Sequence, residues 1–172
     1  MHSERLPHTV SPAKLAQRRI VMCGNIPLGS LDRLCEQLIG SDGDVELQLE
    51  FGKDDQGFTT ITGSASTQVE LICQRCMSEM ELELNAKIAL ALVADDEAAS
   101  KLPGRYEPIL ADDSGFLALR SLVEDDLILA LPIVAKHDAS CGFVDENSSV
   151  EEEIEAETSA ENPFSVLEIL KH

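Results

Sequence analysis

The sequence predicts an α+β fold in which helices pack on one twisted antiparallel sheet, followed by an acidic mobile linker and a short C-terminal helix. Two observations predict it. Between Val45 and Val93, apolar and polar residues alternate over long stretches, as they do in strands with one wet face. On either side, apolar residues recur at helical spacing. With 172 residues, of which 44% are hydrophobic, the chain can bury a core without disulfides.

The elements before the sheet are short. Ser11 and Pro12 provide an N-cap and a proline at the first helical position, which predicts a helix from Pro12 to about Arg19. A strand is expected from Ile20 to Gly24. Ser30 is expected to cap a second helix. Its apolar face would hold Leu31, Leu34, Cys35 and Leu38.

Three strands are expected in the centre of the chain. The first runs from Val45 to Phe51, and Asp54 to Gly57 has the composition of a turn. The second runs from Phe58 to Ile72, and we predict a bulge at Gly63. The third begins at Met80 and continues to Val93.

A longer helix is expected from Leu117 to Leu131, where Pro132 ends it. The run Glu124-Asp125-Asp126 cannot converge on one ion, because adjacent helical residues point in different directions. We therefore predict that these three carboxylates form a solvent-facing stripe. The face toward the core would hold Leu119, Leu122, Val123 and Leu127.

Composition divides the chain into a single α+β domain at residues 1–144, an acidic linker at 145–161 and a docking helix at 162–172. The linker holds eight acidic residues and no basic one. Asn162 and Pro163 can begin the last helix, which places Phe164, Leu167 and Leu170 on one face. So short a helix is marginal alone, so we expect it to pack on its own sheet or on a partner.

The charge balance constrains the partners. The chain has 13 basic and 32 acidic residues, a formal net charge of −19, which opposes broad binding to a phosphate backbone and favours a basic protein partner. Aromatic residues make up only 3%, too few for a stacking platform. Residues 1–20 are an exception, with four basic residues and one acidic residue. The expected contacts to RNA or a partner are Arg5, Lys14, Arg18, Arg19 and Arg75.

The sharpest motif is the CxxC from Cys73 to Cys76. Two thiolates make half of a tetrahedral zinc site, and His137 with Cys141 can supply the other half. The thiols can instead be small apolar groups at a corner of the sheet. A redox pair is disfavoured, because the CxxC lies between strands rather than at a helix N-terminus. Cys23 and Cys35 lie in apolar patterns and are expected in the core.

Other classes lack support in the sequence. There is no GxSxG, Gly-rich phosphate loop or HExxH, so we predict no enzyme. No stretch approaches the roughly 18 uninterrupted apolar residues of a membrane span, and the first residues lack the apolar region of a secretory signal. We therefore expect a cytoplasmic protein with no membrane partner. In a reducing compartment, cysteines serve as metal ligands or buried groups more often than as disulfides.

Several segments resemble the bacterial YceD family, described as large ribosomal RNA subunit accumulation proteins. They are LPHTVSPAKLAQRR near the start, LICQRC at 71–76, YEPI at 106–109, LVEDDLILALPIVAKHD at 122–138 and NPFSVLEILK at 162–171. The resemblance implies a role in the synthesis, processing or stability of 23S ribosomal RNA in the bacterial cytoplasm, with no established catalytic activity. In many relatives further cysteines downstream join the CxxC, which implies a metal site. Here His137 and Cys141 take their place, and Met77 replaces the small residue that often follows the CxxC.

We therefore expect a non-enzymatic factor in ribosome biogenesis that binds a basic ribosomal protein or an rRNA-processing enzyme through its acidic surface. The basic N-terminal stretch offers a second contact, to rRNA itself. The metal would be structural Zn²⁺. The alternative is a metal-dependent RNA-processing enzyme at the CxxC, which needs an open coordination position and a general base.

Overall fold

The computed structural model describes residues 6–111, 113–138 and 141, so Arg5 and the predicted linker and C-terminal helix (145–161 and 162–172) lie outside the described residues. The helices are α1 (Pro12–Gln17), the short 3-10 helix η1 (Leu28–Ser30), α2 (Asp32–Cys35), α3 (Asp96–Ala99) and α4 (Leu119–Ala130). The strands are β1 (Thr9–Val10), β2 (Val21–Pro27), β3 (Asp44–Lys53), β4 (Thr59–Ile72), β5 (Glu79–Val93), β6 (Glu107–Leu110) and β7 (Leu117–Ala118). None of the described helices is long and apolar enough to cross a membrane.

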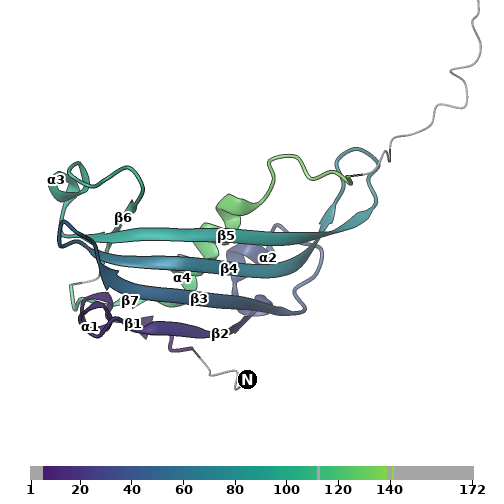
Figure 1. The fold of residues 1–172 in the computed structure, drawn as a ribbon. Coiled ribbons are helices and arrows are strands. Elements are labelled where there is room, and N and C mark those ends of the chain that lie inside the picture. Colours follow the sequence, from purple (N-terminus) through teal and green to yellow (C-terminus); the bar gives the residue numbers. More distant parts are fainter. Residues whose placement is uncertain (1–5, 112, 139–140, 142–172) are drawn as a thin grey trace, which may run out of the picture. The chain divides into compact units, whose positions relative to one another are not determined.

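The strands form one five-stranded sheet in the order β2-β3-β4-β5-β6 and a small sheet of β1 and β7 (Figure 1). The four long strands are antiparallel neighbours, so the predicted α+β fold with an antiparallel sheet is confirmed. The edge strand β6 was not predicted, and it pairs with β5 in parallel. It has only four residues, and their burial does not alternate, so the sequence carries no period-two signal there.

The hairpin of β4 and β5 extends beyond the other strands. Its register runs without interruption from Thr59↔Leu92 to Ile72↔Glu79. β3 pairs with β4 only from Lys53 to Glu46. The far end of the hairpin and its turn therefore reach past the rest of the sheet, as Figure 1 shows at the end opposite α1 and α3.

The predicted bulge at Gly63 is wrong. Gly63 lies opposite Leu49 on β3 and Ile88 on β5 in an unbroken ladder. A Cβ at this position would overlap the carbonyl oxygen of Gln48. The glycine therefore allows β3 and β4 to approach closely, which is the other common reason for a glycine inside a strand.

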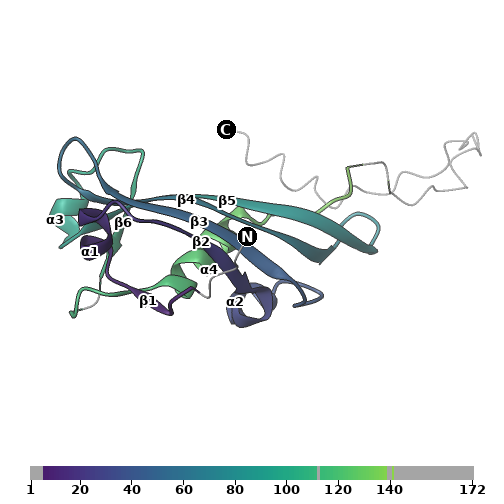
Figure 2. The ribbon, with the colours of Figure 1, turned by 60° about the horizontal axis from the view of Figure 1, so that its bottom comes forward.

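The core lies between one face of the sheet and the helices. Burial on β3 alternates as predicted, with Val45, Leu47, Leu49 and Phe51 inward and polar residues outward. Helix α4 packs against β5, and Figure 2 shows it on one side of the sheet. The predicted inward face of α4 is confirmed, since all its members are buried: Leu119, Leu122, Val123 and Leu127.

Several local predictions need correction. Ser30 does not cap the second helix, because it lies in η1 and its hydroxyl donates to the carbonyl of Pro27 at 2.7 Å. Cys23 is exposed rather than in the core, because it lies opposite Gln48 and, like it, faces outward from the sheet. Cys35 is partly buried and packs against the core. The strand expected at 20–24 extends to Pro27. The helix expected at 117–131 begins two residues later, at Leu119, because Leu117 belongs to β7.

The largest correction concerns Glu124, which is buried (7% exposed) rather than solvent-facing. Its Oε1 accepts the backbone N–H groups of Arg33 at 2.7 Å and Leu34 at 3.2 Å, which open α2. Its Oε2 accepts Nε and Nη2 of Arg33 at 2.9 and 2.8 Å. The residue before α2 is Leu31, which has no capping group, so a carboxylate from α4 caps α2 instead.

Removing this cap tests its contribution. We expect Glu124→Ala to lower the free energy of unfolding by about 2 kcal/mol, because two helix N–H groups lose their acceptor. Asp125 is the matched control, since it is exposed and accepts only Nη1 of Arg33, at 2.7 Å. Asp125→Ala should cost less than about 1 kcal/mol. Urea unfolding of both variants measures the difference, and equal losses would contradict the capping role.

Asp126 should make stability depend on pH. Burial raises the pKa of its carboxyl to about 6, and the nearby charges of Glu107 and Asp125 add to the rise. Between about pH 6 and pH 4 the folded state therefore holds a proton that the unfolded chain has lost, so this group favours folding as pH falls. Asp126→Asn should stabilise the protein by about 1 kcal/mol at pH 7 and less at pH 4. Thermal unfolding at both values checks this, and a gain that grows on acidification would refute it.

Candidate metal centre

The turn between β4 and β5 holds the CxxC. The backbone N–H of Cys73 donates to the carbonyl of Ser78 at 2.9 Å, and that of Met77 donates to the carbonyl of Cys73, also at 2.9 Å. Met77 has a φ of 59°, in the left-handed region that favours glycine, and it is 71% exposed. A side chain there costs about 1–2 kcal/mol, so the tight turn depends on other stabilising contacts.

The chain after α4 returns to this turn. Leu131 is extended, as expected before Pro132, and ends the helix. The backbone N–H of Gln74 then donates to the carbonyl of Ala135 at 2.8 Å. This bond ties the two segments together and places His137 beside the CxxC.

Four candidate ligand atoms meet here. The sulfur atoms and one ring nitrogen of the four predicted residues all lie within 4.8 Å of one another. Cys73 Sγ is 3.5 Å from Cys141 Sγ, and His137 Nδ1 is 3.5 Å from Cys76 Sγ and 3.3 Å from Cys141 Sγ. A tetrahedral Zn²⁺ with bonds of about 2.0–2.3 Å keeps its ligand atoms about 3.5–3.8 Å apart. The donor set and its spacing therefore suit one zinc ion.

The histidine ring is oriented for metal binding. His137 Nε2 lies 3.2 Å from the backbone carbonyl of Glu79, the first residue of β5. A carbonyl oxygen only accepts, so this contact places the ring proton on Nε2 and leaves Nδ1 free as a ligand. Sequence reasoning could not find Glu79, because its contribution is a backbone atom that any residue would supply.

Two of the three thiols, those of Cys73 and Cys76, are biased toward the thiolate that metals bind. Burial raises the pKa of Cys73, but three backbone N–H groups and the Cys141 side chain outweigh it and bring the pKa to about 5. Those N–H groups belong to Cys76, Arg75 and His137. A backbone N–H from Ser78 likewise lowers the pKa of Cys76. Such N–H···S bonds stabilise negative sulfur.

Arg75 is exposed, as expected for the middle of the CxxC, but its guanidinium turns onto the cluster. Nε donates to Cys141 Sγ and Nη2 to the carbonyl of His137, both at 3.0 Å. Burial raises the pKa of Cys141, and Arg75 opposes the rise. A site of three thiolates, one histidine and Zn²⁺ carries one net negative charge, which this guanidinium can balance.

The predicted basic contacts are not gathered in one place. Lys14 lies on α1 with its ammonium 5.8 Å above the ring of Phe116. Arg18 and Arg19 are exposed just after that helix. Figures 1 and 2 both show α1 at the end of the sheet opposite the CxxC turn, so Arg75 lies far from them.

Four protein donors fill a tetrahedral site, an arrangement typical of zinc that stabilises a fold. When bound, zinc would cross-link the β4–β5 turn to the chain after α4 through Cys73, Cys76, His137 and Cys141. Catalytic zinc sites usually have three protein ligands and one water. The donor set therefore favours a structural ion.

Zinc content tests the site directly. We expect the purified protein to hold about one zinc per chain, and Cys73→Ser to lose it, with a thermal midpoint several degrees lower. Cys23→Ser is the control, because Cys23 is exposed on β2 away from the cluster. Plasma mass spectrometry and thermal unfolding measure both effects. Zinc retained in the Cys73 variant, or lost in both, would contradict this assignment.

The comparisons with known proteins agree with the resemblance noted above. Residues 61–171 match the family described as "Large ribosomal RNA subunit accumulation protein YceD". The chain is 36% identical over 172 residues to the protein of that name from Haemophilus influenzae, a match that covers 99% of each chain. No solved structure matches significantly. By family match and full-length similarity together, this chain belongs to the YceD family.

Proposed function

We propose that this protein is a non-enzymatic factor in ribosome biogenesis that supports the accumulation of 23S ribosomal RNA in the bacterial cytoplasm. The observation that carries the proposal is the similarity over the full chain to a large ribosomal RNA subunit accumulation protein. The match extends over 99% of both chains, so the similarity is not confined to one segment. The description of the family names an effect on RNA accumulation and no reaction.

We further propose that the protein acts by binding a basic protein, either a ribosomal protein or an rRNA-processing enzyme. A formal net charge of −19 repels RNA phosphates at moderate salt and attracts basic surfaces. The acidic side chains of β3, Glu46 and Glu50, and of β5, Glu81 and Glu83, are exposed. Exposed Lys14, Arg18 and Arg19 offer a separate, smaller contact for rRNA.

In this proposal the metal has a structural role. Zn²⁺ held by the three cysteines and His137 would stabilise the far end of the β4–β5 hairpin, where few other elements support it. The competing hypothesis, a metal-dependent nuclease, requires a ligand position left for water.

Two measurements test the proposal. Deleting the gene from its host should lower the ratio of 23S to 16S rRNA, and the plasmid-borne gene should restore it. The tagged full chain, isolated from native lysate at about 0.1 M salt, should bring down a ribosomal or rRNA-processing protein of high pI that is lost near 1 M salt.

Nuclease treatment before the isolation separates the two routes. The basic protein should remain bound after RNA is digested. Recovery of 23S fragments alone, with no protein left after digestion, would refute the protein-binding mechanism. An unchanged rRNA ratio in the deletion strain would refute the proposed role itself.

A further inference from the structure

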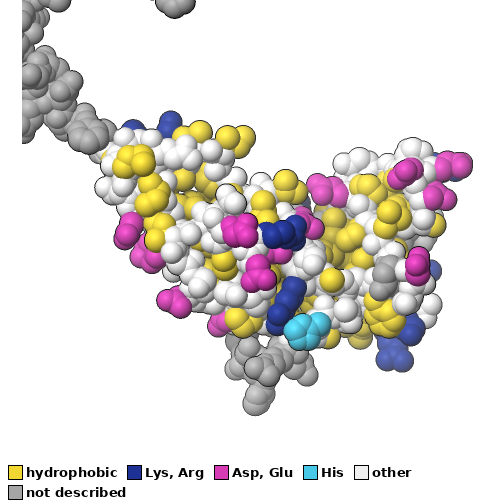
Figure 3. Space-filling view, turned by 180° about the vertical axis from the view of Figure 1, so that it is seen from behind, with side chains coloured by type: hydrophobic (Ala, Val, Ile, Leu, Met, Phe, Trp, Pro, Cys, Tyr) yellow, Lys and Arg dark blue, Asp and Glu magenta, His cyan; other side chains and the backbone are white. Residues whose placement is uncertain are grey.

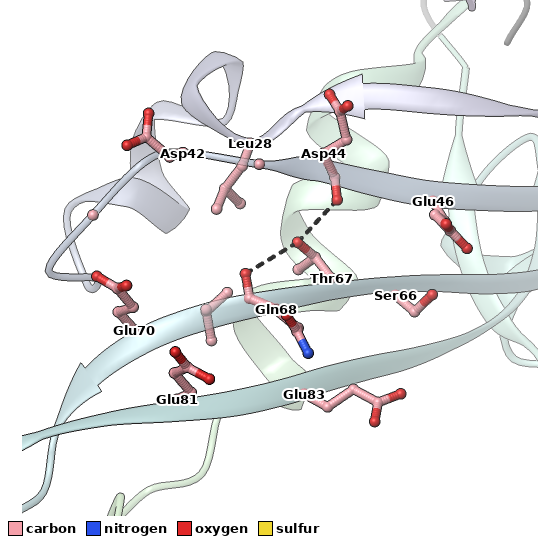
Figure 4. A pocket seen from close by; sticks show the side chains of 13 residues that line it. Leu28, Asp42, Asp44, Glu46, Ser66, Thr67, Gln68, Glu70, Glu81 and Glu83 are labelled. Carbon is pink, nitrogen blue, oxygen red and sulfur yellow. Dashed lines mark hydrogen bonds between the residues drawn. The ribbon is translucent and has the colours of Figure 1, made fainter.

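A groove opens where β3 and β4 separate. Their pairing ends at Glu46↔Ser66, while β4 continues beside β5 to Ile72. The first residues of β3 pair only with β2, where Asp44 lies opposite Pro27. The resulting groove has a volume of about 640 Å³ and lies on the outward-facing side of the sheet (Figure 4).

Polar and backbone contacts maintain the two walls. Thr67 on β4 donates its hydroxyl hydrogen to the carbonyl of Asp44 at 3.1 Å, across the point of separation. Farther along, the backbone N–H of Ile39 donates to the carbonyl of Glu70 at 2.9 Å. The groove is therefore a formed feature of the sheet, bounded by hydrogen bonds at both of these points.

The lining of the groove is strongly acidic. Six of its residues carry carboxylates, and none of the described residues that line it is basic. The six are Asp42, Asp44, Glu46, Glu70, Glu81 and Glu83. A concave surface of one charge focuses the electrostatic field and attracts counter-ions of the opposite sign.

Two of these carboxylates repel each other across the strands. Glu70 on β4 lies directly opposite Glu81 on β5, and Figure 4 shows their side chains next to each other. Like charges in directly opposed positions destabilise a sheet. The ion pairs found among the described residues lie elsewhere and involve Arg33, Lys101 and Arg105. The groove lining thus carries carboxylates that form none of these ion pairs, and a bound cation would relieve their repulsion.

Leu28 and Val69 line the groove but are almost fully buried, at 1% and 2% exposed, so the carboxylates form the surface that a ligand would meet. Carboxylates accept charge-assisted hydrogen bonds from the charged ends of lysine and arginine side chains. The opposite side of the molecule is mixed, because Figure 3 shows basic, acidic and hydrophobic side chains among one another there.

We propose that this groove is the docking site for a basic segment of the protein partner and receives its arginine or lysine side chains. The inference rests on the proposed function and adds the surface at which the partner binds. Charge complementarity selects the occupant, because six carboxylates repel a nucleic acid. The carboxylates come from β3, β4, β5 and the segment before β3, a spread that fits several side chains rather than one compact ion.

The test compares two variants of equal charge. The groove variant combines Glu70→Gln, Glu81→Gln and Glu83→Gln. The control variant combines Asp55→Asn, Asp96→Asn and Asp113→Asn, three exposed positions that do not line the groove. Both should fold, and the groove variant should unfold at an equal or higher temperature because the Glu70–Glu81 repulsion is gone.

The probe is an arginine decapeptide, measured by fluorescence anisotropy with the full chain at about 0.1 M salt. We expect the groove variant to bind it at least about tenfold more weakly than the parent chain, and the control variant within about threefold. A glutamate decapeptide and a uridine decamer should not bind. Equal losses in the two variants would overturn the proposal, as would a uridine decamer that binds the parent chain and not the groove variant.

The outcome can be separated from that of the proposed function. If native chain and groove variant recover the same basic protein from lysate equally well, the docking site is wrong and the proposed function stands. If the decapeptide binds at the groove but no basic ribosomal or processing protein is recovered and the rRNA ratio is unchanged in the deletion strain, the groove binds cations and the proposed function fails.

Discussion

The unbroken register of the β4–β5 hairpin is the constraint on which the rest of this structure depends. Residues that alternate along the two strands face either the core, where α4 packs, or the outside, where Glu70, Glu81 and Glu83 lie. The same register places Cys73 and Cys76 in the turn, beyond the point where β3 stops pairing. A shift by one residue would exchange the apolar and acidic faces along the whole hairpin.

Helix α4 links α2 and the CxxC turn through a few long-range contacts. Near its middle, Glu124 caps α2 and so organises the segment that leads into β3. After its last residue the chain reaches the CxxC turn, where Ala135 accepts a backbone hydrogen bond and His137 approaches the thiols. The metal-ligand cluster and the acidic groove both involve β5. Its first residue, Glu79, orients the histidine ring, and Glu81 and Glu83 line the groove. A metal at the turn would support one wall of the groove.

Much of the fold follows from local patterns. Alternation over β3 and β5 predicted strands with one buried face, because side chains of a strand point to opposite sides in turn. Helical spacing likewise predicted the inward face of α4. Short elements escaped prediction: β6 and the pair β1–β7 have four residues or fewer, and their strand conformation comes from pairing rather than from their own sequence. Gly63 was misassigned, because a bulge and a close approach of strands both call for glycine.

By itself, the sequence identified thiols and an imidazole as candidate metal ligands, because these groups bind zinc, and it determined the sign of the net charge. Only the fold brings the ligand atoms of Cys73 and Cys76 within 4.8 Å of those of His137 and Cys141. It could not determine that Glu124 is buried, because an acid in an exposed-looking helical position becomes a cap only when another helix presents unpaired N–H groups to it. The groove likewise depends on tertiary structure. Its carboxylates come from separate strands and a loop, and only the separation of β3 from β4 brings them around one cavity.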